Sequence, residues 1–187
     1  RQAKKYKVKN VIITDFDSYL KFKKLNKNKK LKIFSSFYDL NRIFKSKIDY
    51  VMSSIIGLNG LDPTIKIIKH TKNIAIANKE SIICGWNLIN QELKKYKTTF
   101  VPVDSEHFSI WYALKNTQNS NIYKIILTAS GGPLLKIPIN KINNLKTKDI
   151  LNHPNWRMGK KITVDSSTMM NKVFEIIEAK NIFKVNL

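Results

Sequence analysis

Short apolar runs alternate with amphipathic stretches from the start of the chain, and this alternation limits the possible folds more than any other feature. Strands are predicted at Val8–Thr14, Leu31–Ser35, Asp49–Ser53, Asn73–Ala77 and Thr98–Val103. The helices predicted between them start near Asp15, run through Arg42, extend from Asp62-Pro63 to about His70, and cover Glu80–Tyr96. Since single helices separate the strands, the pattern favours parallel βαβ units in a doubly wound sheet.

The later part of the chain is expected to form a second α/β region. A helix is predicted at Ser105–Lys115, a strand at Ile122–Ala129 and a last helix at Ser166–Lys180, which Asp165 and its polar neighbours would cap. Lys136–Asn155 contains two prolines and several asparagines, which is typical of a loop with one short helix. The predicted fold is therefore a mainly parallel, Rossmann-like sheet followed by an α/β domain.

The start of one helix and the glycine-containing loop before it each allow a specific prediction. Asp62 is predicted to cap its helix, with Pro63 at the first helical position. Gly57 and Gly60 follow a strand, but no further glycine completes the G-x-G-x-x-G pattern of a dinucleotide-binding loop. In a dinucleotide fold, the first strand and its phosphate loop would then lie upstream of Arg1.

The composition narrows the class of protein. A chain of 187 residues with 43% hydrophobic residues can bury a core, and no run of about 18 apolar residues suggests a membrane span. A single cysteine, Cys84, excludes an internal disulfide framework and fits a reducing compartment. The net charge of +21 is compatible with a nucleic-acid-binding module. The lysines are scattered, however, and no nucleic-acid-binding motif accompanies them.

Three acidic residues, Asp104, Glu106 and Glu175, are predicted to form one metal site. Asp104 and Glu106 follow a predicted strand and are two residues apart, a spacing that points strand side chains the same way. Glu175 lies on a later helix, where Asn171 and Lys172 are spaced to share its face. Carboxylate oxygens are the ligands that Mg²⁺ and Mn²⁺ prefer.

Other polar clusters occur where predicted elements meet. Asn78-Lys79-Glu80 links a strand to a helix, a position where ligands bind in open α/β sheets, although simple helix capping is the alternative. Ser130-Gly131-Gly132 could let a phosphate approach the backbone or form an ordinary turn. His153–Gly159 has the composition of a flap that closes over a substrate, or of an ordinary loop anchored by Trp156. His107, beside Glu106, could brace the metal site or be structural.

The wording and order of four motifs resemble one enzyme family. These are Ala-Asn-Lys-Glu-Ser from Ala77, Pro-Val-Asp-Ser-Glu-His from Pro102, Ala-Ser-Gly-Gly-Pro from Ala129, and the long run from His153 to Glu175. Together they resemble 1-deoxy-D-xylulose 5-phosphate reductoisomerase. The resemblance covers essentially the whole chain and is weakest over residues 1–50.

The resemblance implies an NADPH-dependent and Mg²⁺- or Mn²⁺-dependent enzyme of isoprenoid synthesis. Its reaction would isomerise and reduce 1-deoxy-D-xylulose 5-phosphate to 2-C-methyl-D-erythritol 4-phosphate. It implies an NADPH-binding domain over residues 1–103 and a catalytic domain with the metal site and flap over residues 104–187. The parent would be a homodimer in a bacterial cytoplasm or a plastid-type organelle, without nucleic-acid or membrane partners. This chain alone would be inactive or poorly active.

The same resemblance implies a role for each motif residue. The metal ligands would be Asp104, Glu106 and Glu175. The catalytic residues would be these three together with Lys79 and His153. The substrate contacts would be Lys79, Ser105, Glu106, Ser130, His153, Ser166, Asn171, Lys172 and Glu175. The cofactor contacts would be Asn78, Glu80 and Gly159. The chain departs from the family pattern at Leu134, Arg157, Ser167 and Val173, none of which is an implied ligand.

Two other functions remain open on the residues alone. One is a metal-dependent sugar-phosphate isomerase or aldolase-type enzyme that uses no nicotinamide. The other is the basic nucleic-acid-binding module, which predicts that the acidic trio is scattered in space.

Overall fold

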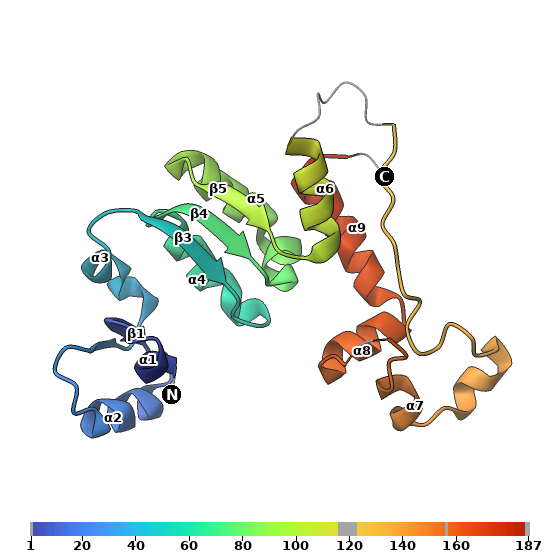
Figure 1. Ribbon diagram of the computed structural model, residues 1–187, viewed down its shortest axis with the longest axis horizontal. Helices are drawn as coiled ribbons and strands as arrows, with labels where there is room; N and C mark the ends of the chain where they lie inside the picture. Colours follow the sequence, from blue (N-terminus) through green and yellow to red (C-terminus); the bar gives the residue numbers. More distant parts are fainter. Residues whose placement is uncertain (1, 116–122, 156, 186–187) are drawn as a thin grey trace. The chain divides into compact units, whose positions relative to one another are not determined.

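The computed structural model describes residues 2–115, 123–155 and 157–185 (Figure 1). These residues form two compact units. The first contains Arg1–Ser81 and Asn87–Val101, and the second contains Ile82–Trp86 and Pro102–Leu187. None of the described helices is both long enough and apolar enough to cross a bilayer.

The first unit begins with a small parallel βαβ arrangement. Its elements are α1 (Gln2–Lys5), β1 (Asn10–Ile12), α2 (Phe16–Leu25) and β2 (Lys32–Phe34). β1 and β2 pair in parallel, with Val11 opposite Ile33. Asp15 caps α2 by accepting a hydrogen bond from the Ser18 amide at 2.9 Å. The two strands and the helix between them were all predicted from the sequence.

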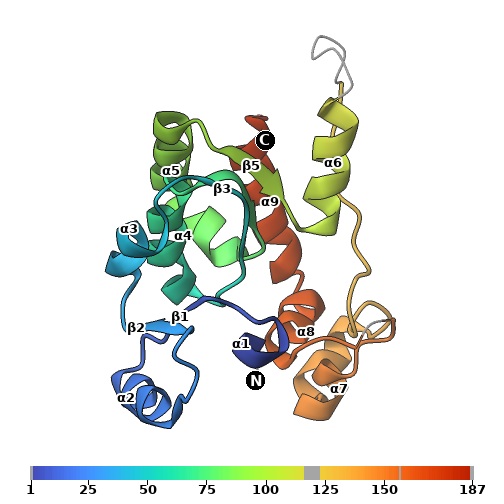
Figure 2. The ribbon, with the colours of Figure 1, turned by 60° about the vertical axis from the view of Figure 1, so that its left-hand side comes forward.

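A second, three-stranded sheet completes this unit. Its elements are η1 (Phe37–Asp39), α3 (Leu40–Ile43), β3 (Ile48–Ser53), η2 (Leu58–Gly60), α4 (Leu61–Ile68), β4 (Thr71–Ile76), α5 (Lys79–Tyr96) and β5 (Thr99–Pro102). The strand order is β3-β4-β5, and β3 and β4 are parallel, in register from Ile48 opposite Thr71 to Ser53 opposite Ile76. Figure 2 shows α4 and α5 beside the strands that they connect. The α/β class with parallel strands is as predicted, but the described strands form two sheets rather than one.

The core of the first unit lies around the central strand β4. Ile74, Ala75 and Ile76 are buried, as are Ile68 of α4 and Ile89 of α5. A parallel strand with helices on its faces has no solvent-facing side, and the second half of β4 is accordingly apolar and buried, whereas Lys72 near its start is exposed. Its carboxyl end is thereby held at a fixed place, where the Asn78 segment follows.

The start of α4 differs from the prediction. The helix begins at Leu61, and Gly60 rather than Asp62 occupies the position before it, without a side-chain cap. Gly60 already has helical angles because the turn η2 runs directly into α4, so no extended capping residue is present. Asp62 lies within the first turn and pairs with Lys66 at 2.7 Å.

His70, at the end of α4, gives this unit an expected pH dependence. Burial, together with the neighbouring charge of Lys69, lowers the pKa of His70 below its usual 6.5. The unfolded chain therefore binds a proton more readily than the folded one, and the free energy of unfolding should decrease as the pH falls through about 6.5. Urea unfolding of the complete protein at a series of pH values should show a shallower decrease in His70→Leu. Equal slopes in the two proteins would contradict a lowered pKa.

The second unit is helical. Its elements are α6 (Ser105–Lys115), η4 (Ile139–Asn144), α7 (Thr147–Leu151), α8 (Lys160–Ser167) and α9 (Met170–Phe183). The bounds of α6 are those predicted, and the loop Lys136–Asn155 contains two short helical segments instead of one. The predicted strand Ile122–Ala129 is wrong over residues 123–129, which form no regular structure. A strand needs a neighbouring backbone for its hydrogen bonds, and this segment has none among the described strands.

The predicted last helix, Ser166–Lys180, is in fact the end of one helix and most of another. α8 starts after Gly159 and ends at Ser167, and α9 starts after Met169, whose φ of 60° is left-handed. The hydroxyls of Ser167 and Thr168 donate back to the Val164 carbonyl at 2.7 and 3.1 Å, which favours a helix end. Ser166 therefore lies in the last turn of α8 and does not cap α9, so the cap predicted from Asp165 and its polar neighbours is wrong.

Candidate metal and substrate site

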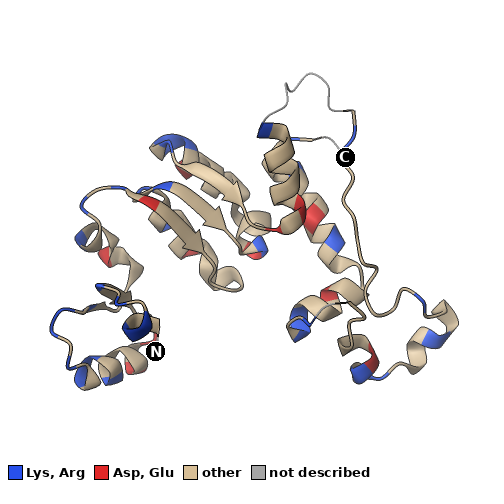
Figure 3. Cartoon of the chain, in the orientation of Figure 1, with Lys and Arg blue, Asp and Glu red and all other residues tan. Residues whose placement is uncertain are grey.

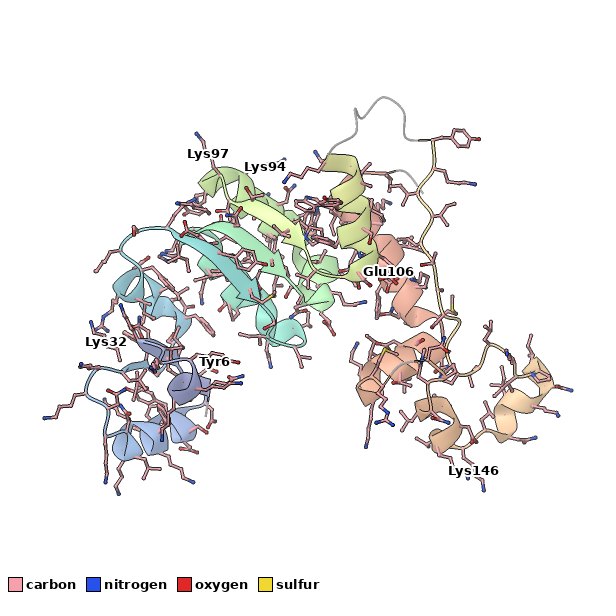
Figure 4. All side chains as sticks on the ribbon, in the orientation of Figure 1. Tyr6, Lys32, Lys94, Lys97, Glu106 and Lys146 are labelled. Carbon is pink, nitrogen blue, oxygen red and sulfur yellow. The ribbon has the colours of Figure 1, made fainter. Side chains whose placement is uncertain are left out.

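The three predicted metal ligands converge within the second unit. Asp104 directly precedes α6, Glu106 lies in its first turn, and Glu175 lies on α9. One carboxylate oxygen from each residue lies within 4.8 Å of those of the other two. Figure 4 shows Glu106 at the end of α6 that approaches α9. The expected convergence is therefore observed, with two carboxylates from the start of one helix and the third from a helix later in the chain.

The start of α6 fixes the directions of its two carboxylates. The Glu106 amide donates to Asp104 Oδ1 at 3.2 Å, in the manner of a helix cap. The Ser105 hydroxyl donates to Glu106 Oε2 at 2.6 Å. Each of these carboxylates thus has a local donor that restrains it and leaves further lone pairs for a cation.

Glu175 is buried and is held by its own helix. Asn171 Nδ2 donates to Glu175 Oε1 at 2.5 Å, and Lys172 Nζ donates to Glu175 Oε2. Lys172 Nζ also lies 3.5 Å from Glu106 Oε1. Three carboxylates and one ammonium leave two negative charges in excess, and the donors are hard oxygens. This donor set fits a divalent Mg²⁺ or Mn²⁺ ion.

His107 joins the two helices that carry these ligands. The imidazole is fully buried, with Nε2 2.9 Å from the Glu175 carbonyl oxygen and Nδ1 3.2 Å from Asp104 Oδ1. The carboxylate of buried Glu178 lies 3.9 Å from Nδ1. Burial lowers the pKa of His107, but the contacts with Asp104, the Glu175 carbonyl and Glu178 raise it by more, so the net pKa is raised.

Glu178 was not identified as a site residue from the sequence. It lies three residues after Glu175 on α9, a spacing that places two helical side chains on one face, so the signal was present. The structure shows it buried beside His107, and together with Asp104 these residues form a second acidic cluster.

The second unit also brings together two of the implied substrate contacts, Ser130 and His153. Ser130 Oγ lies 3.2 Å from His153 Nε2, and the Gly132 amide donates to the same hydroxyl at 3.3 Å. Because the Asn155 amide donates to His153 Nδ1, a neutral imidazole carries its proton on Nε2 and donates it to Ser130. The Ser130 hydroxyl can then donate its own proton in a hydrogen bond to another acceptor.

Gly132 brings this loop against the end of α8. Its φ is +65°, and a Cβ built on it would lie 2.5 Å from the Ser166 carbonyl oxygen. Only a glycine permits so close an approach in this conformation. The Ser166 backbone therefore lies against the loop that carries Ser130, although Ser130 lies in a loop rather than at the predicted strand end. Trp156 lies outside the described residues.

The implied cofactor contacts are divided between the units. In the first unit, Asn78 is the buried cap of α5, and Lys79 and Glu80 lie in its first turn. In the second unit, Gly159 is exposed and occupies the cap position of α8. The Asn78 side chain accepts from the Ser81 amide and donates to the carbonyls of Ile55 and Gly57.

The four departures from the family pattern do not lie on the carboxylate trio. Ser167 is buried and bonds within α8, Leu134 is partly buried, and Arg157 and Val173 are exposed. Each of these four residues therefore affects the packing or the surface of the protein more directly than it affects the binding of a ligand.

Comparison with family models and known sequences gives a consistent match. The model of the 1-deoxy-D-xylulose 5-phosphate reductoisomerase family matches residues 1–85, and the model of that enzyme's C-terminal domain matches residues 100–183. The 1-deoxy-D-xylulose 5-phosphate reductoisomerase of Pelagibacter ubique is 62% identical over 100% of this chain and 48% of its own length. That of Clostridium kluyveri is 45% identical over 92% of this chain and 46% of its own length.

Solved structures give the same result for the fold. A crystal structure of DOX-P reductoisomerase in complex with NADPH, fosmidomycin and magnesium has a TM-score of 0.83 at 32% identity, covering 99% of this chain and 48% of that one. The Zymomonas mobilis enzyme in complex with NADPH has a TM-score of 0.82 at 32% identity, covering 98% and 47%. This chain spans about half the length of the curated relatives that it matches. The converged carboxylates, the motif order and these matches agree that the chain belongs to the 1-deoxy-D-xylulose 5-phosphate reductoisomerase family.

Proposed function

We propose that the protein carrying this chain converts 1-deoxy-D-xylulose 5-phosphate to 2-C-methyl-D-erythritol 4-phosphate, using NADPH and a divalent cation. The observation that carries the proposal is the convergence of Asp104, Glu106 and Glu175, with Asn171 and Lys172 bonded to the deepest carboxylate. Membership of the reductoisomerase family supports the substrate and the cofactor. Relatives solved with NADPH and magnesium support the same pair of ligands.

The candidate metal and substrate residues, all of which except Lys79 lie in the second unit, are assigned roles in this reaction. Asp104, Glu106 and Glu175 would hold the Mg²⁺ or Mn²⁺ ion, which supplies a Lewis acid for the oxygen atoms of the sugar. Hydroxyl and amide donors hold the phosphate and the sugar hydroxyls, and thereby fix the reacting carbons in place. The proposed substrate contacts are Lys79, Ser105, Glu106, Ser130, His153, Ser166, Asn171, Lys172 and Glu175.

The first unit is assigned to the cofactor. NADPH supplies the reducing equivalents, and the proposed residues of its site are Asn78 and Glu80 of this unit together with Gly159 of the second unit. We assign residues 1–103 to an NADPH-binding domain and residues 104–187 to the catalytic domain. A boundary between the two compact units at Val101 and Pro102 supports this division, although the turn Ile82–Trp86 of α5 belongs to the second unit.

The remaining assignments rest on the family. We propose a homodimer, in the cytoplasm of a bacterium or in a plastid-type organelle; the relatives named above are bacterial. Lys and Arg occur on helices and loops of both units (Figure 3). This spread favours a general basic character, which attracts phosphorylated ligands, over a dedicated nucleic-acid-binding face.

The proposal is tested by an activity assay of the complete protein. NADPH consumption should require both 1-deoxy-D-xylulose 5-phosphate and Mg²⁺ or Mn²⁺, and mass spectrometry should identify 2-C-methyl-D-erythritol 4-phosphate as the product. A chelator should abolish turnover because the carboxylate trio alone supplies no Lewis acid, and added Mg²⁺ should restore it. Conversion of the sugar phosphate without NADPH consumption would instead favour an isomerase that uses no nicotinamide.

A further inference from the structure

A loop at the carboxyl end of β3 exposes apolar side chains. It runs from Ile55 through Gly57 to Leu58, and the relative exposures are 41% for Ile55, 83% for Ile56 and 61% for Leu58. In open α/β sheets, ligands bind beyond the carboxyl ends of the strands. An exposed apolar loop at this edge is suited to cover a flat ring of a dinucleotide.

Asn78 ties this loop to the start of α5. Its Nδ2 donates to the carbonyl of Ile55 and, at 2.8 Å, to that of Gly57, and its Oδ1 accepts from the Ser81 amide at 3.0 Å. The residue is only 4% exposed. A side-chain amide has two N–H donors, so both are used by the loop. The Asn78 side chain therefore has no donor left for a ligand.

The surrounding backbone is built to allow these bonds. A Cβ on Gly60 would lie 2.3 Å from Asn78 Nδ2 and 2.3 Å from the Ile55 carbonyl oxygen, while Gly57 has a φ of +75°. On the other side of the turn, the Ser53 and Thr64 hydroxyls are 2.6 Å apart, and Thr64 Oγ1 donates to the Gly60 carbonyl at 2.6 Å. A buried polar network thus fixes the base of the loop while its apolar tip stays exposed.

We infer that Asn78 is a positioning residue for the NADPH site, which acts on the cofactor through the loop Ile55–Leu58 and not through a contact of its own side chain. This inference rests on the proposed function, because it takes NADPH as the ligand. The hydrogen-bonded loop keeps one conformation before the ligand arrives, so binding does not have to order it.

The test is Asn78→Ser in the complete protein. Serine is a good helix cap and can still accept from the Ser81 amide, but it cannot reach the two loop carbonyls. Loss of both loop bonds should raise the Kd for NADPH, measured by fluorescence quenching, by on the order of tenfold. The value of kcat at saturating NADPH should change by less than about threefold, since the catalytic groups are untouched. Hydrogen exchange of the Ile55–Leu58 amides should become faster.

Asn73→Ser is the matched control. Asn73 Nδ2 also donates to a strand carbonyl, that of Asp49 at 2.8 Å, within the same unit and near the other end of β3. This variant should leave the Kd for NADPH unchanged. Asn78→Asp, which keeps the size and the cap but has no N–H donor, should reproduce the weaker binding if Asn78→Ser does not fold.

The outcomes separate this inference from the proposed function. Failure of the unaltered protein to bind NADPH would overturn both. Normal NADPH binding by Asn78→Ser or Asn78→Asp, in a protein that is otherwise active, would overturn the positioning role alone. A Kd for NADPH raised equally in Asn73→Ser would also overturn it, because the effect would then be one of general stability.

Discussion

Glu106→Gln in the complete protein is expected to lower kcat by on the order of 10²-fold or more. The substitution keeps the shape of the side chain and its contact with Ser105 but removes a negative charge from the carboxylate trio. A cation held by fewer charges binds less tightly and is less well placed to polarise the substrate's oxygens. Steady-state kinetics with Mg²⁺ varied over a wide range should show a higher Mg²⁺ requirement as well as the lower kcat.

Lys172→Ala is expected to change a different kinetic constant from Glu106→Gln. Its ammonium is a proposed partner of a phosphate or hydroxyl group that changes little during reaction, so its loss should act mainly through a higher KM for the sugar phosphate. A near-normal kcat for Glu106→Gln at ordinary Mg²⁺ concentration would show that the trio is not the catalytic metal site. The assignment of all three carboxylates would then fail together.

His107→Leu is expected to destabilise the second unit by about 3–5 kcal/mol. The imidazole lies between the Asp104 and Glu178 carboxylates and also reaches the Glu175 carbonyl. Leucine fills much of the volume but leaves the Glu175 carbonyl without its hydrogen bond and removes the imidazole from between two carboxylates in a buried site. Such a loss costs more than that of an exposed bond. Hydrogen exchange of the α6 and α9 amides should report the loss as a lower free energy of opening.

His153→Leu is the control for that measurement. His153 lies in a loop of the same unit, where its hydrogen bond to Ser130 is exposed, so the free energy of opening of α6 and α9 should change by less than about 1 kcal/mol. Equal effects of the two substitutions would mean that His107 contributes no more than an ordinary loop contact.

The sequence predicts well those elements whose signals are local. α6 has the predicted bounds because its polar start and apolar period lie within a single segment. The strand expected before Ala129 fails because a strand depends on a partner elsewhere in the chain, which a local pattern does not reveal. The break between α8 and α9 was missed because Met169, and not a glycine, takes the left-handed conformation.

For the candidate site too, the features with local sequence signals were predicted and those that depend on tertiary contacts were not. The spacing of Asp104 and Glu106, with a third carboxylate on a helix, was enough to predict the trio. Glu106 lies in the first turn of the predicted helix α6, so the start of this helix, and not strand alternation, directs its side chain. The burial of His107 and Glu178 depends on how α6 packs against α9, which the sequence does not specify. The use of the Asn78 amide by a loop more than twenty residues earlier is likewise a property of the tertiary structure.

The position of Lys172 has a consequence for how a cation exchanges with this protein. Its ammonium bridges Glu106 and Glu175 and so lessens the mutual repulsion that would push bare carboxylates apart. An incoming divalent ion competes with this built-in monovalent one, and the free energy spent on displacing it is subtracted from the affinity for the ion. The proposed metal site would thus be preassembled and would bind its ion reversibly, and the displaced ammonium would become available to an anionic ligand when the ion arrives.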